Sequence, residues 1–289
     1  MKIVNNFEKH FVTYGDNKFN IQKKRLSHQA RNFEIFNQIH VYGKKDLSKS
    51  FVDKYFKILK NSIGGGYWLW KPYVIQDVLS KTNENDIILY LDAGSTLNIE
   101  GKNRLIEYFK MIEVSESSFL RFQIKEKEKY WTSKEVFEEL GIEIDSEIGN
   151  SNQLAGGIIF IKNNYESKEF FKKFFDIVEK NPDLITDYYQ DNQIEDFKSP
   201  RHDQSILSIL GKSMNSIVLD DETYFVDNPE KQFSFPILTV RDNEYSVWQK
   251  LKFYSNYFYN INKPIFFKVK PPYYKNISIY KRVRNKLFN

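Results

Sequence analysis

The sequence contains no cysteine and only three methionines in 289 residues. The absence of cysteine excludes disulfides and thiolate metal sites. The chain also lacks a run of about 18 apolar residues that could span a bilayer, and its first residues lack an apolar core of the length found in signal peptides. We therefore expect a protein that is made and kept in the cytoplasm.

Aromatic residues are abundant instead, at 17% of the chain, with 25 Phe and 19 Tyr. A composition of 41% hydrophobic and 28% charged residues suits a soluble globular protein with a sizeable core. A chain of this length forms one large domain or two smaller ones. The aromatic excess fits a core built on Phe and Tyr as well as a site that stacks sugars or bases, and composition does not separate the two.

The net charge of +5 is unevenly distributed. The last stretch, residues 263–289, is rich in Lys and Arg interleaved with Phe and Tyr, and it contains no Asp or Glu. Such a tail suits contact with an anionic partner. We predict that residues 263–289 contact the anionic inner face of the plasma membrane, which would make the protein peripheral there. A solvated terminus fits the composition equally well, and no specific nucleic acid is expected.

Apolar runs typical of strands alternate with segments of helical spacing. Strands are expected at 10–16, 38–43, 87–91, 118–124 and 154–162. Helices are expected at 19–36, 50–60, from Pro72 onward, and at 132–141, 167–181 and 201–212. This order predicts an α/β domain over residues 1–235, with a mainly parallel sheet flanked by helices. Residues 236–289 are predicted to form a helical, basic-aromatic extension.

Polar residues follow two of the predicted strands. Thr13, Tyr14 and Asp16 come at the end of the first strand, and Asp92 directly follows the apolar run "IILYL". Open α/β sheets bind ligands beyond the carboxyl ends of their strands. A carboxylate placed there can hold a hard cation that neutralises phosphate oxygens. Asp92 is equally suited to capping the turn that follows.

Two glycine-rich stretches are unusual for their settings. In "GGGYWLWKP", residues 64–72, the glycines allow a close turn, and Tyr67, Trp68 and Trp70 offer flat faces for a sugar or a base. Lys71, beside a helix start, is suited to a diphosphate, and part of the segment is expected to pack in the core. The pair at 156–157 interrupts an apolar strand, which indicates a bulge or the close approach of a ligand.

One alternative function is a hydrolase of the phosphatase type that uses a strand-end aspartate as its nucleophile. "DAGST", residues 92–96, imitates the Asp-x-Asp-Gly-Thr pattern of that fold, and "LDDE", residues 219–222, offers an acidic pair for a metal. The second aspartate of the pattern is missing, which weakens this hypothesis. A second alternative is a non-catalytic protein that binds carbohydrate or nucleic acid through its aromatic residues and basic tail.

An ordered set of motifs carries a resemblance to a known family. "FVTYGD" (11–16), "GYWLWKP" (66–72), "ILYLDAG" (88–94), "AGG" (155–157), "RHDQS" (201–205) and "DETY" (221–224) occur in this order. The set resembles a bacterial family of GT-A glycosyltransferases that builds surface polysaccharides such as capsule and lipopolysaccharide. The resemblance implies transfer of a sugar from a nucleotide-diphosphate donor, with a UDP-sugar favoured, to a glycan or lipid-linked glycan acceptor.

The resemblance also implies roles for single residues. The donor site would use Thr13, Tyr14, Asp16, Tyr67, Trp70, Lys71, Asp92 and Gly94. The acceptor or sugar pocket would use Gln153, Gly156, Gly157 and Gln204. Asp92 and Asp203 would be catalytic. We interpret Asp203 as the candidate base because "HDQ" opens a predicted helix after a polar loop, and the same aspartate can also serve as the N-cap of that helix. The usual metal motif is Asp-x-Asp, but Gly94 stands where its second aspartate is expected. A divalent cation, Mn²⁺ or Mg²⁺, would therefore need Asp92 with help from His202.

Overall fold

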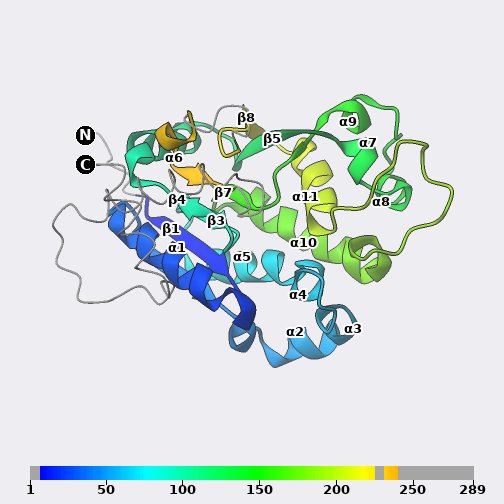
Figure 1. The fold of residues 1–289 in the computed structure, drawn as a ribbon, viewed down its shortest axis with the longest axis horizontal. Helices are drawn as coiled ribbons and strands as arrows, with labels where there is room; N and C mark the ends of the chain where they lie inside the picture. Colours follow the sequence, from blue (N-terminus) through cyan, green and yellow to red (C-terminus); the bar gives the residue numbers. More distant parts are fainter. Residues whose placement is uncertain (1–6, 225–230, 240–289) are drawn as a thin grey trace, which may run out of the picture. The chain divides into compact units, whose positions relative to one another are not determined.

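The computed structural model describes residues 7–224 and 231–239 of the chain (Figure 1). The chain divides into two compact units, Met1–Arg241 and Asp242–Asn289, and all described residues belong to the first. The predicted extension 236–289 lies almost entirely outside the described residues. Its helical character, the domain boundary at residue 235 and the contact of residues 263–289 with a membrane therefore stay predictions.

A seven-stranded sheet forms the centre of the described residues, in the order β2-β1-β3-β7-β5-β6, with β8 on the other side of β5. Strands β2, β1, β3, β5 and β8 run in one direction, and β7 and β6 run in the other. The predicted α/β class with a mainly parallel sheet is confirmed. The strands are β1 (Lys9–Tyr14), β2 (Gln38–Tyr42), β3 (Ile87–Leu91), β5 (Phe119–Lys127), β6 (Asn152–Leu154), β7 (Ile158–Lys162) and β8 (Ser216–Asp220), while β4 (Thr96–Leu97) and β9 (Ile237–Leu238) form a separate pair.

Helices lie between the strands along the chain. The α-helices are α1 (Asn20–Asn32), α2 (Lys49–Lys54), α3 (Phe56–Leu59), α4 (Gly64–Tyr67), α5 (Trp70–Lys81), α6 (Lys102–Val114), α7 (Glu128–Trp131), α8 (Lys134–Glu139), α9 (Glu147–Asn150), α10 (Tyr165–Lys180) and α11 (Asp203–Lys212). Short 3-10 turns are η1 (Asn17–Phe19), η2 (Lys44–Asp46), η3 (Ile99–Gly101), η4 (Pro182–Ile185) and η5 (Lys231–Ser234). Each helix in the described part of the chain falls short of the length or the apolar character that a bilayer span requires.

The sheet is covered on both faces because successive side chains of a strand point to opposite sides. In β3, Ile88 and Tyr90 pack with residues of α5, α10 and α11. Ile87, Leu89 and Leu91 pack on the other face with residues of α1 and α6. Strand β3 is therefore buried along its whole length, and the chain regains partial exposure at Asp92, where the strand has just ended.

Three predicted elements differ from the structure. The strand predicted at 154–162 is divided into β6 and β7, because residues 155–157 with their two glycines leave the ladder. The helix predicted at 50–60 is divided at Tyr55 into α2 and α3. Pro72 is the third residue of α5 rather than its first. Proline is still tolerated there because the first turn of a helix leaves its N–H groups without helical partners.

Candidate active site

Three charged side chains meet at the carboxyl end of β3. Asp92 follows β3, Lys71 is the second residue of α5, and Asp203 is the first residue of α11. The Nζ of Lys71 lies 2.6 Å from Oδ2 of Asp203 and 3.4 Å from Oδ1 of Asp92. It also donates a hydrogen bond of 3.0 Å to the carbonyl of Gly156. The fold thus brings together four residues that the sequence singled out in four separate motifs.

The lysine of this cluster is buried and fully engaged. Lys71 is 2% exposed and Asp203 3% exposed, whereas the side chain of Asp92 is 35% exposed. Burial lowers the pKa of Lys71, but the two carboxylates outweigh burial and leave this pKa raised above its usual value. An ammonium has three protons to donate, and three acceptors surround it. Lys71 was predicted to contact a diphosphate, and such a contact would have to displace one of these acceptors.

Tyr90 holds Asp92 from within the sheet. Its hydroxyl donates a hydrogen bond of 2.6 Å to Oδ1 of Asp92. Burial raises the pKa of Tyr90 well above its usual value, and the charge of Asp92 adds to the shift, so the hydroxyl stays a donor. Tyr90 was predicted only as part of the apolar run "IILYL", without a role in the site. Its spacing was the available signal, because residues two apart in a strand share a face.

The free oxygen of Asp92 faces a glycine. Tyr90 and Lys71 both contact Oδ1, and no described residue donates a hydrogen bond to Oδ2. A Cβ added to Gly157 would lie 2.8 Å from this Oδ2, closer than side chains approach. The backbone N–H of Asp92 donates to the carbonyl of Gly157 at 2.9 Å. Gly157 therefore fixes the aspartate through its backbone and leaves room for the carboxylate.

A left-handed turn leads into α5. Residues 64–68 all have positive φ, between 50° and 102°. A left-handed helix costs about 1–2 kcal/mol for each residue with a Cβ, and glycine avoids this cost. A Cβ on Gly64 would lie 2.2 Å from the ring of Trp68, and one on Gly66 would lie 2.6 Å from the Cα of Leu59. Space and dihedral angles therefore both require glycine at these two positions.

Three of the residues with side chains that adopt positive φ lie together here, with the ring of His202 packed on those of Tyr67 and Trp68. Tyr67, Trp68 and His202 have φ values of 50°, 57° and 51°. The ring of His202 lies 5.5 Å from that of Trp68 and 4.9 Å from that of Tyr67, centroid to centroid. Asp187 accepts a hydrogen bond of 3.2 Å from the Tyr67 hydroxyl and lies 3.5 Å from Nε2 of His202.

This strained backbone immediately precedes both members of the buried ion pair. Trp68 comes three residues before Lys71, and His202 directly precedes Asp203. Residues held in such conformations cost on the order of 1–3 kcal/mol each and cluster at functional sites. The packing of the two turns therefore fixes the backbone from which the lysine and the aspartate project. His202, predicted as a metal ligand, has no ion pair or hydrogen bond with Asp92 in the described residues.

The predicted donor residues at β1 are divided between core and surface. Thr13 and Tyr14 are buried. The ring of Tyr14 stacks on that of Trp70 with centroids 3.9 Å apart and an interplanar angle of 19°. The indole N–H of Trp70 donates to the carbonyl of Gly64 at 2.8 Å. The ring of Tyr14 thus covers one face of Trp70. The buried Trp70 in turn holds the glycine turn through its hydrogen bond to Gly64.

Asp16 is the partly exposed member of the β1 group. Its Oδ1 accepts a hydrogen bond of 2.8 Å from the backbone of Lys18 and so caps η1. Its Oδ2 lies 3.7 Å from the position that a Cβ of Gly65 would take. The end of β1 and the left-handed turn therefore lie side by side. Gly94 is exposed, and no atom lies within 4 Å of the position of its Cβ.

The predicted sugar-pocket glutamines belong to a buried hydrogen-bond chain. Gln204 accepts from the N–H of Gly156 at 3.0 Å and donates to Oε1 of Gln153 at 2.9 Å. Gln153, which is fully buried, donates in turn to Glu128 at 3.0 Å. Lys212 pairs with this glutamate at 2.8 Å. The chain supports the Gly156 peptide that contacts the buried lysine, and its partly exposed members are Gln204 and Lys212.

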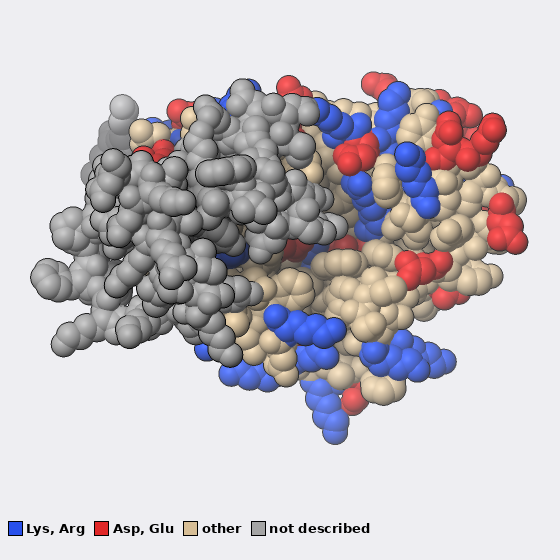
Figure 2. All heavy atoms as spheres, in the orientation of Figure 1, with Lys and Arg blue, Asp and Glu red and all other residues tan. Residues whose placement is uncertain are grey.

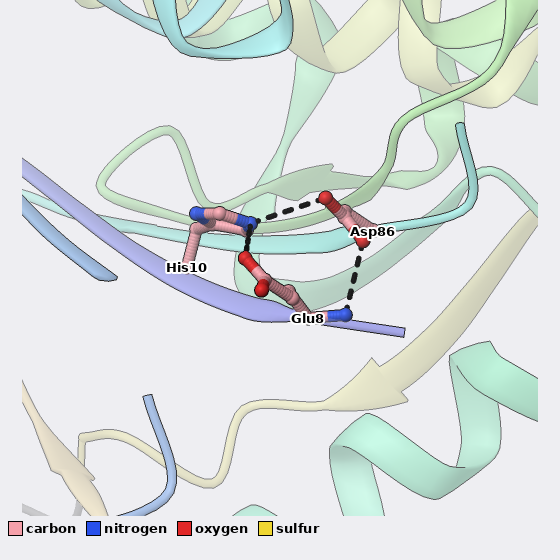
Figure 3. Close-up of side chains that lie close together, drawn as sticks. All are labelled: Glu8, His10 and Asp86. Atoms are coloured by element: carbon pink, nitrogen blue, oxygen red, sulfur yellow. Dashed lines mark hydrogen bonds and ion pairs between the residues drawn. The ribbon is translucent and has the colours of Figure 1, made fainter. Parts of the chain in front are cut away.

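A second polar cluster lies at the opposite end of the sheet. In the described part of the chain, Glu8, His10 and Asp86 form the one group of three potential ligands whose atoms lie within 4.8 Å (Figure 3). Nε2 of His10 lies 3.3 Å from Asp86 and 3.6 Å from Glu8. These residues stand at the amino ends of β1 and β3, which they tie together. The predicted metal ligands Asp92 and His202 do not belong to this group.

Of three comparisons with known proteins, the one with solved structures found matches. No protein-family model matches the chain, and no curated protein sequence matches it. The chain superposes on the bifunctional glycosyltransferase WbbM with a TM-score of 0.54 and 11% identity, over 98% of this chain and 53% of that one. It therefore spans about half the length of that protein.

Two further structures are matched at lower TM-scores. One is the galactosyltransferase LgtC in complex with donor and acceptor sugar analogues, with a TM-score of 0.45 and 10% identity over 79% of this chain and 86% of that one. The other is a glycosyltransferase involved in glycosylation of the major capsid of PBCV-1. Its TM-score is 0.45, with 12% identity over 80% of this chain and 93% of that one. Likeness at such identity concerns the fold alone. The described unit has the fold of GT-A glycosyltransferases.

Proposed function

We propose that the chain is a glycosyltransferase that moves a sugar from a nucleotide-diphosphate donor to a glycan or lipid-linked glycan. The observation that carries this proposal is Asp92, whose free and partly exposed oxygen stands at the carboxyl end of the buried central strand of a glycosyltransferase fold. Ligands of open α/β sheets bind at this edge. A UDP-sugar as donor and a role in capsule or lipopolysaccharide synthesis rest on the motif resemblance.

The donor would lie across the adjoining ends of β1 and β3. Asp16 and Gly65 border the part proposed for the nucleoside, and the exposed backbone at Gly94 offers space for the diphosphate beside Asp92. Gly157 and the partly exposed Gln204 border the other side of the carboxylate, where the sugar is proposed to lie. The ion pairs of Lys71 with Asp92 and Asp203 fix the positions of these side chains beneath the proposed donor site.

A divalent cation fits the free oxygen of Asp92. Mg²⁺ in nucleotide sites is commonly bound by one or two carboxylates together with substrate phosphates. One exposed carboxylate is available here, and Gly94 supplies no second one. The formal charge of Lys71, Asp92 and Asp203 together is −1, so a donor diphosphate needs further positive charge. When bound, Mn²⁺ or Mg²⁺ would neutralise the leaving diphosphate. We leave His202 out of this proposed site because its Nε2 faces Asp187.

Asp203 is proposed to act through Lys71 rather than on the acceptor. A general base must come within hydrogen-bond reach of the proton it takes, and Asp203 is 3% exposed with Oδ2 on the lysine. Its position instead neutralises the lysine and keeps the ammonium beside Asp92. The more exposed Asp92 is the carboxylate that a substrate can reach, which makes it the candidate catalytic residue of the pair.

The proposed role of Asp203 predicts a pH dependence. Burial raises the pKa of Asp203 from 3.8 to about 6, against the opposing charge of Lys71. Protonation then removes the partner of the lysine, so kcat/KM is expected to fall as the pH drops through about 6. Asp203→Asn should abolish this acidic limb. An acidic limb that persists unchanged in Asp203→Asn would assign it to another group.

The same pKa shift predicts the opposite trend in stability. A carboxyl group with a raised folded-state pKa binds protons more tightly in the native state. Its stabilising contribution is therefore complete below about pH 4 and is lost as the pH rises through about 6. The difference in free energy of unfolding between wild type and Asp203→Asn, measured from pH 4 to 8, should follow this curve. A difference that does not change with pH would contradict the assignment.

Gly157→Ala tests the geometry of Asp92. The added methyl group would meet the free carboxylate oxygen at 2.8 Å, so the carboxylate must move. Because small misplacements in a site reduce rates strongly, we expect kcat/KM to fall by about tenfold or more. Gly141→Ala is the control, since its methyl group enters open space outside the proposed site, at a positive φ of 64° that also tests for a general loss of stability. Equal kinetics for the two variants would show that the exact position of the carboxylate has no influence on the rate.

A thermal-shift screen of nucleoside diphosphates, with and without Mn²⁺, tests the proposed donor class. We expect one nucleotide to raise the melting temperature selectively, and the shift to grow with Mn²⁺. No shift with any nucleotide would count against a nucleotide-sugar donor. It would favour the non-catalytic binding protein, which would then bind glycans or RNA without turnover.

The acidic pair that the phosphatase hypothesis assigns to a metal makes other contacts in the structure. Glu222 forms a salt bridge of 2.6 Å with Arg104 and accepts from the hydroxyl of Tyr108. Asp221 accepts from the N–H of Thr223 at 2.9 Å and from its hydroxyl at 2.6 Å. These two carboxylates are committed to structural contacts, so Asp221 and Glu222 offer little to a catalytic metal. Turnover of a simple aryl phosphate that Asp92→Asn abolishes would restore this alternative.

A further inference from the structure

A surface that is both basic and apolar runs along α2 and α3. Residues 44–63 contain six lysines and two aspartates, and all six lysines are exposed. Figure 2 shows Lys and Arg side chains gathered along the edge that α2 and α3 occupy in Figure 1, with few acidic side chains among them. Lys54 is paired with Glu179. The remaining charge is a strong local excess for a chain whose overall net charge is +5.

Large apolar side chains stand among these lysines. Phe56 is 59% exposed and Ile63 is 41% exposed, while Phe19 and Ile21, at the start of α1, are 45% and 46% exposed. We call these four apolar residues, with the lysines of residues 44–60, the basic-apolar rim. Several large apolar side chains exposed along one edge are typical of a site that meets a protein partner or a membrane.

Hydrogen bonds join the two parts of the rim. The Nζ of Lys23 in α1 donates to the carbonyls of Gly15 at 2.8 Å and of Tyr42 at 3.3 Å. This contact holds the first turns of α1 against the segment that continues into Lys44. The apolar side chains at the start of α1 therefore belong to the same edge of the molecule as the lysines.

The rim also borders the proposed donor site. Asp16 caps η1, which ends at Phe19, and its Oδ2 lies 3.7 Å from the position of a Cβ on Gly65. Ile63 directly precedes the left-handed turn to which this glycine belongs. Any flat partner that covers the rim would therefore lie next to the mouth of the site rather than on a remote face.

We propose that the basic-apolar rim docks on an anionic lipid bilayer. The negative surface potential of such a bilayer attracts lysines, and Phe and Ile can enter the boundary between headgroups and acyl chains. The two isoleucines favour lipid over nucleic acid, because aliphatic side chains do not stack on bases as aromatic ones do. The inference deepens the proposed function and rests on it for one point, that the acceptor is carried by a lipid of this bilayer.

Vesicle sedimentation with the full chain tests the rim. Wild type is expected to pellet with vesicles of phosphatidylglycerol and phosphatidylethanolamine at low salt, and to stay in solution with phosphatidylcholine alone. Two double variants, Lys57→Glu with Lys60→Glu and Ile21→Ser with Phe56→Ser, should each lower the partition coefficient at least tenfold. The control Lys110→Glu with Lys127→Glu makes the same charge change at exposed positions of α6 and β5. It should stay within twofold of wild type.

Three outcomes would overturn the proposal. Rim variants that pellet like wild type would place membrane binding elsewhere, for example in residues 263–289. Equal binding to phosphatidylcholine would exclude recognition of anionic lipid. If the rim variants lose binding to RNA but still pellet with vesicles, the partner of the rim is a polyanion such as RNA rather than a bilayer. The thermal shift by a nucleoside diphosphate should survive in every rim variant, so failure of lipid docking can be told apart from failure of the proposed sugar transfer.

Discussion

Replacing Lys71 with methionine is expected to lower the free energy of unfolding by about 3–5 kcal/mol and to abolish sugar transfer. Methionine keeps the apolar stem of the side chain but removes the charge between Asp203 and Asp92. Asp203 is 3% exposed, so it would be left as an uncompensated buried carboxylate. Urea unfolding measures the stability, and release of nucleoside diphosphate from a donor measures the activity.

The same helix provides the control for this variant. Lys81 is 58% exposed and pairs with Asp77 at 2.5 Å. Exposed pairs contribute about 0–1 kcal/mol, so Lys81→Met should change stability little. Combining Lys71→Met with Asp203→Asn should recover most of the lost stability without restoring activity. If Lys71→Met proves as stable as Lys81→Met, the buried ion pair does not hold the site together.

Asp92→Asn is expected to lower the rate of transfer by about two to three orders of magnitude, as the loss of a principal electrostatic contact does. The melting temperature should change little, because the amide oxygen can still accept from Tyr90 and the buried Lys71 keeps Asp203. Circular dichroism and a donor-release assay measure the two quantities. This separation of activity from stability distinguishes Asp92 from Lys71.

A surface aspartate calibrates the effect of the substitution itself. Asp145 is 88% exposed and pairs with Lys129 at 3.0 Å, so Asp145→Asn should leave both activity and stability unchanged. Transfer by Asp92→Asn at a rate close to that of Asp145→Asn would remove Asp92 from the chemistry.

Much of the fold was predictable because the strands are marked by continuous apolar runs. "IILYL" indicated a strand buried on both faces, and β3 is such a strand. The break at Gly156 and Gly157 could be located as a weakness in a strand. Its form could not, because it depends on contacts with Asp92 and Gln204, which lie far away in the sequence.

The sequence singled out several residues of the candidate site, but it did not predict the contacts between their side chains. Lys71 and Asp203 were both singled out, but 131 positions separate them, and no local pattern reports that their side chains form a buried pair. The three glycines indicated a close turn, but its left-handed sense extends to Tyr67 and Trp68, which disfavour it. Asp187 gave no signal at all, since its contacts exist only after the chain has folded.

The most direct test of sugar transfer offers the full chain a panel of nucleotide-diphosphate sugars with Mn²⁺ or Mg²⁺. Release of nucleoside diphosphate and the mass of any glycosylated acceptor are measured for wild type and for Asp92→Asn. We expect wild type to consume one donor in preference to the others, and the variant to lose this activity while remaining folded. Consumption of no donor by folded wild type, or equal consumption by both proteins, would contradict the assignment of this edge of the sheet as the site of sugar transfer.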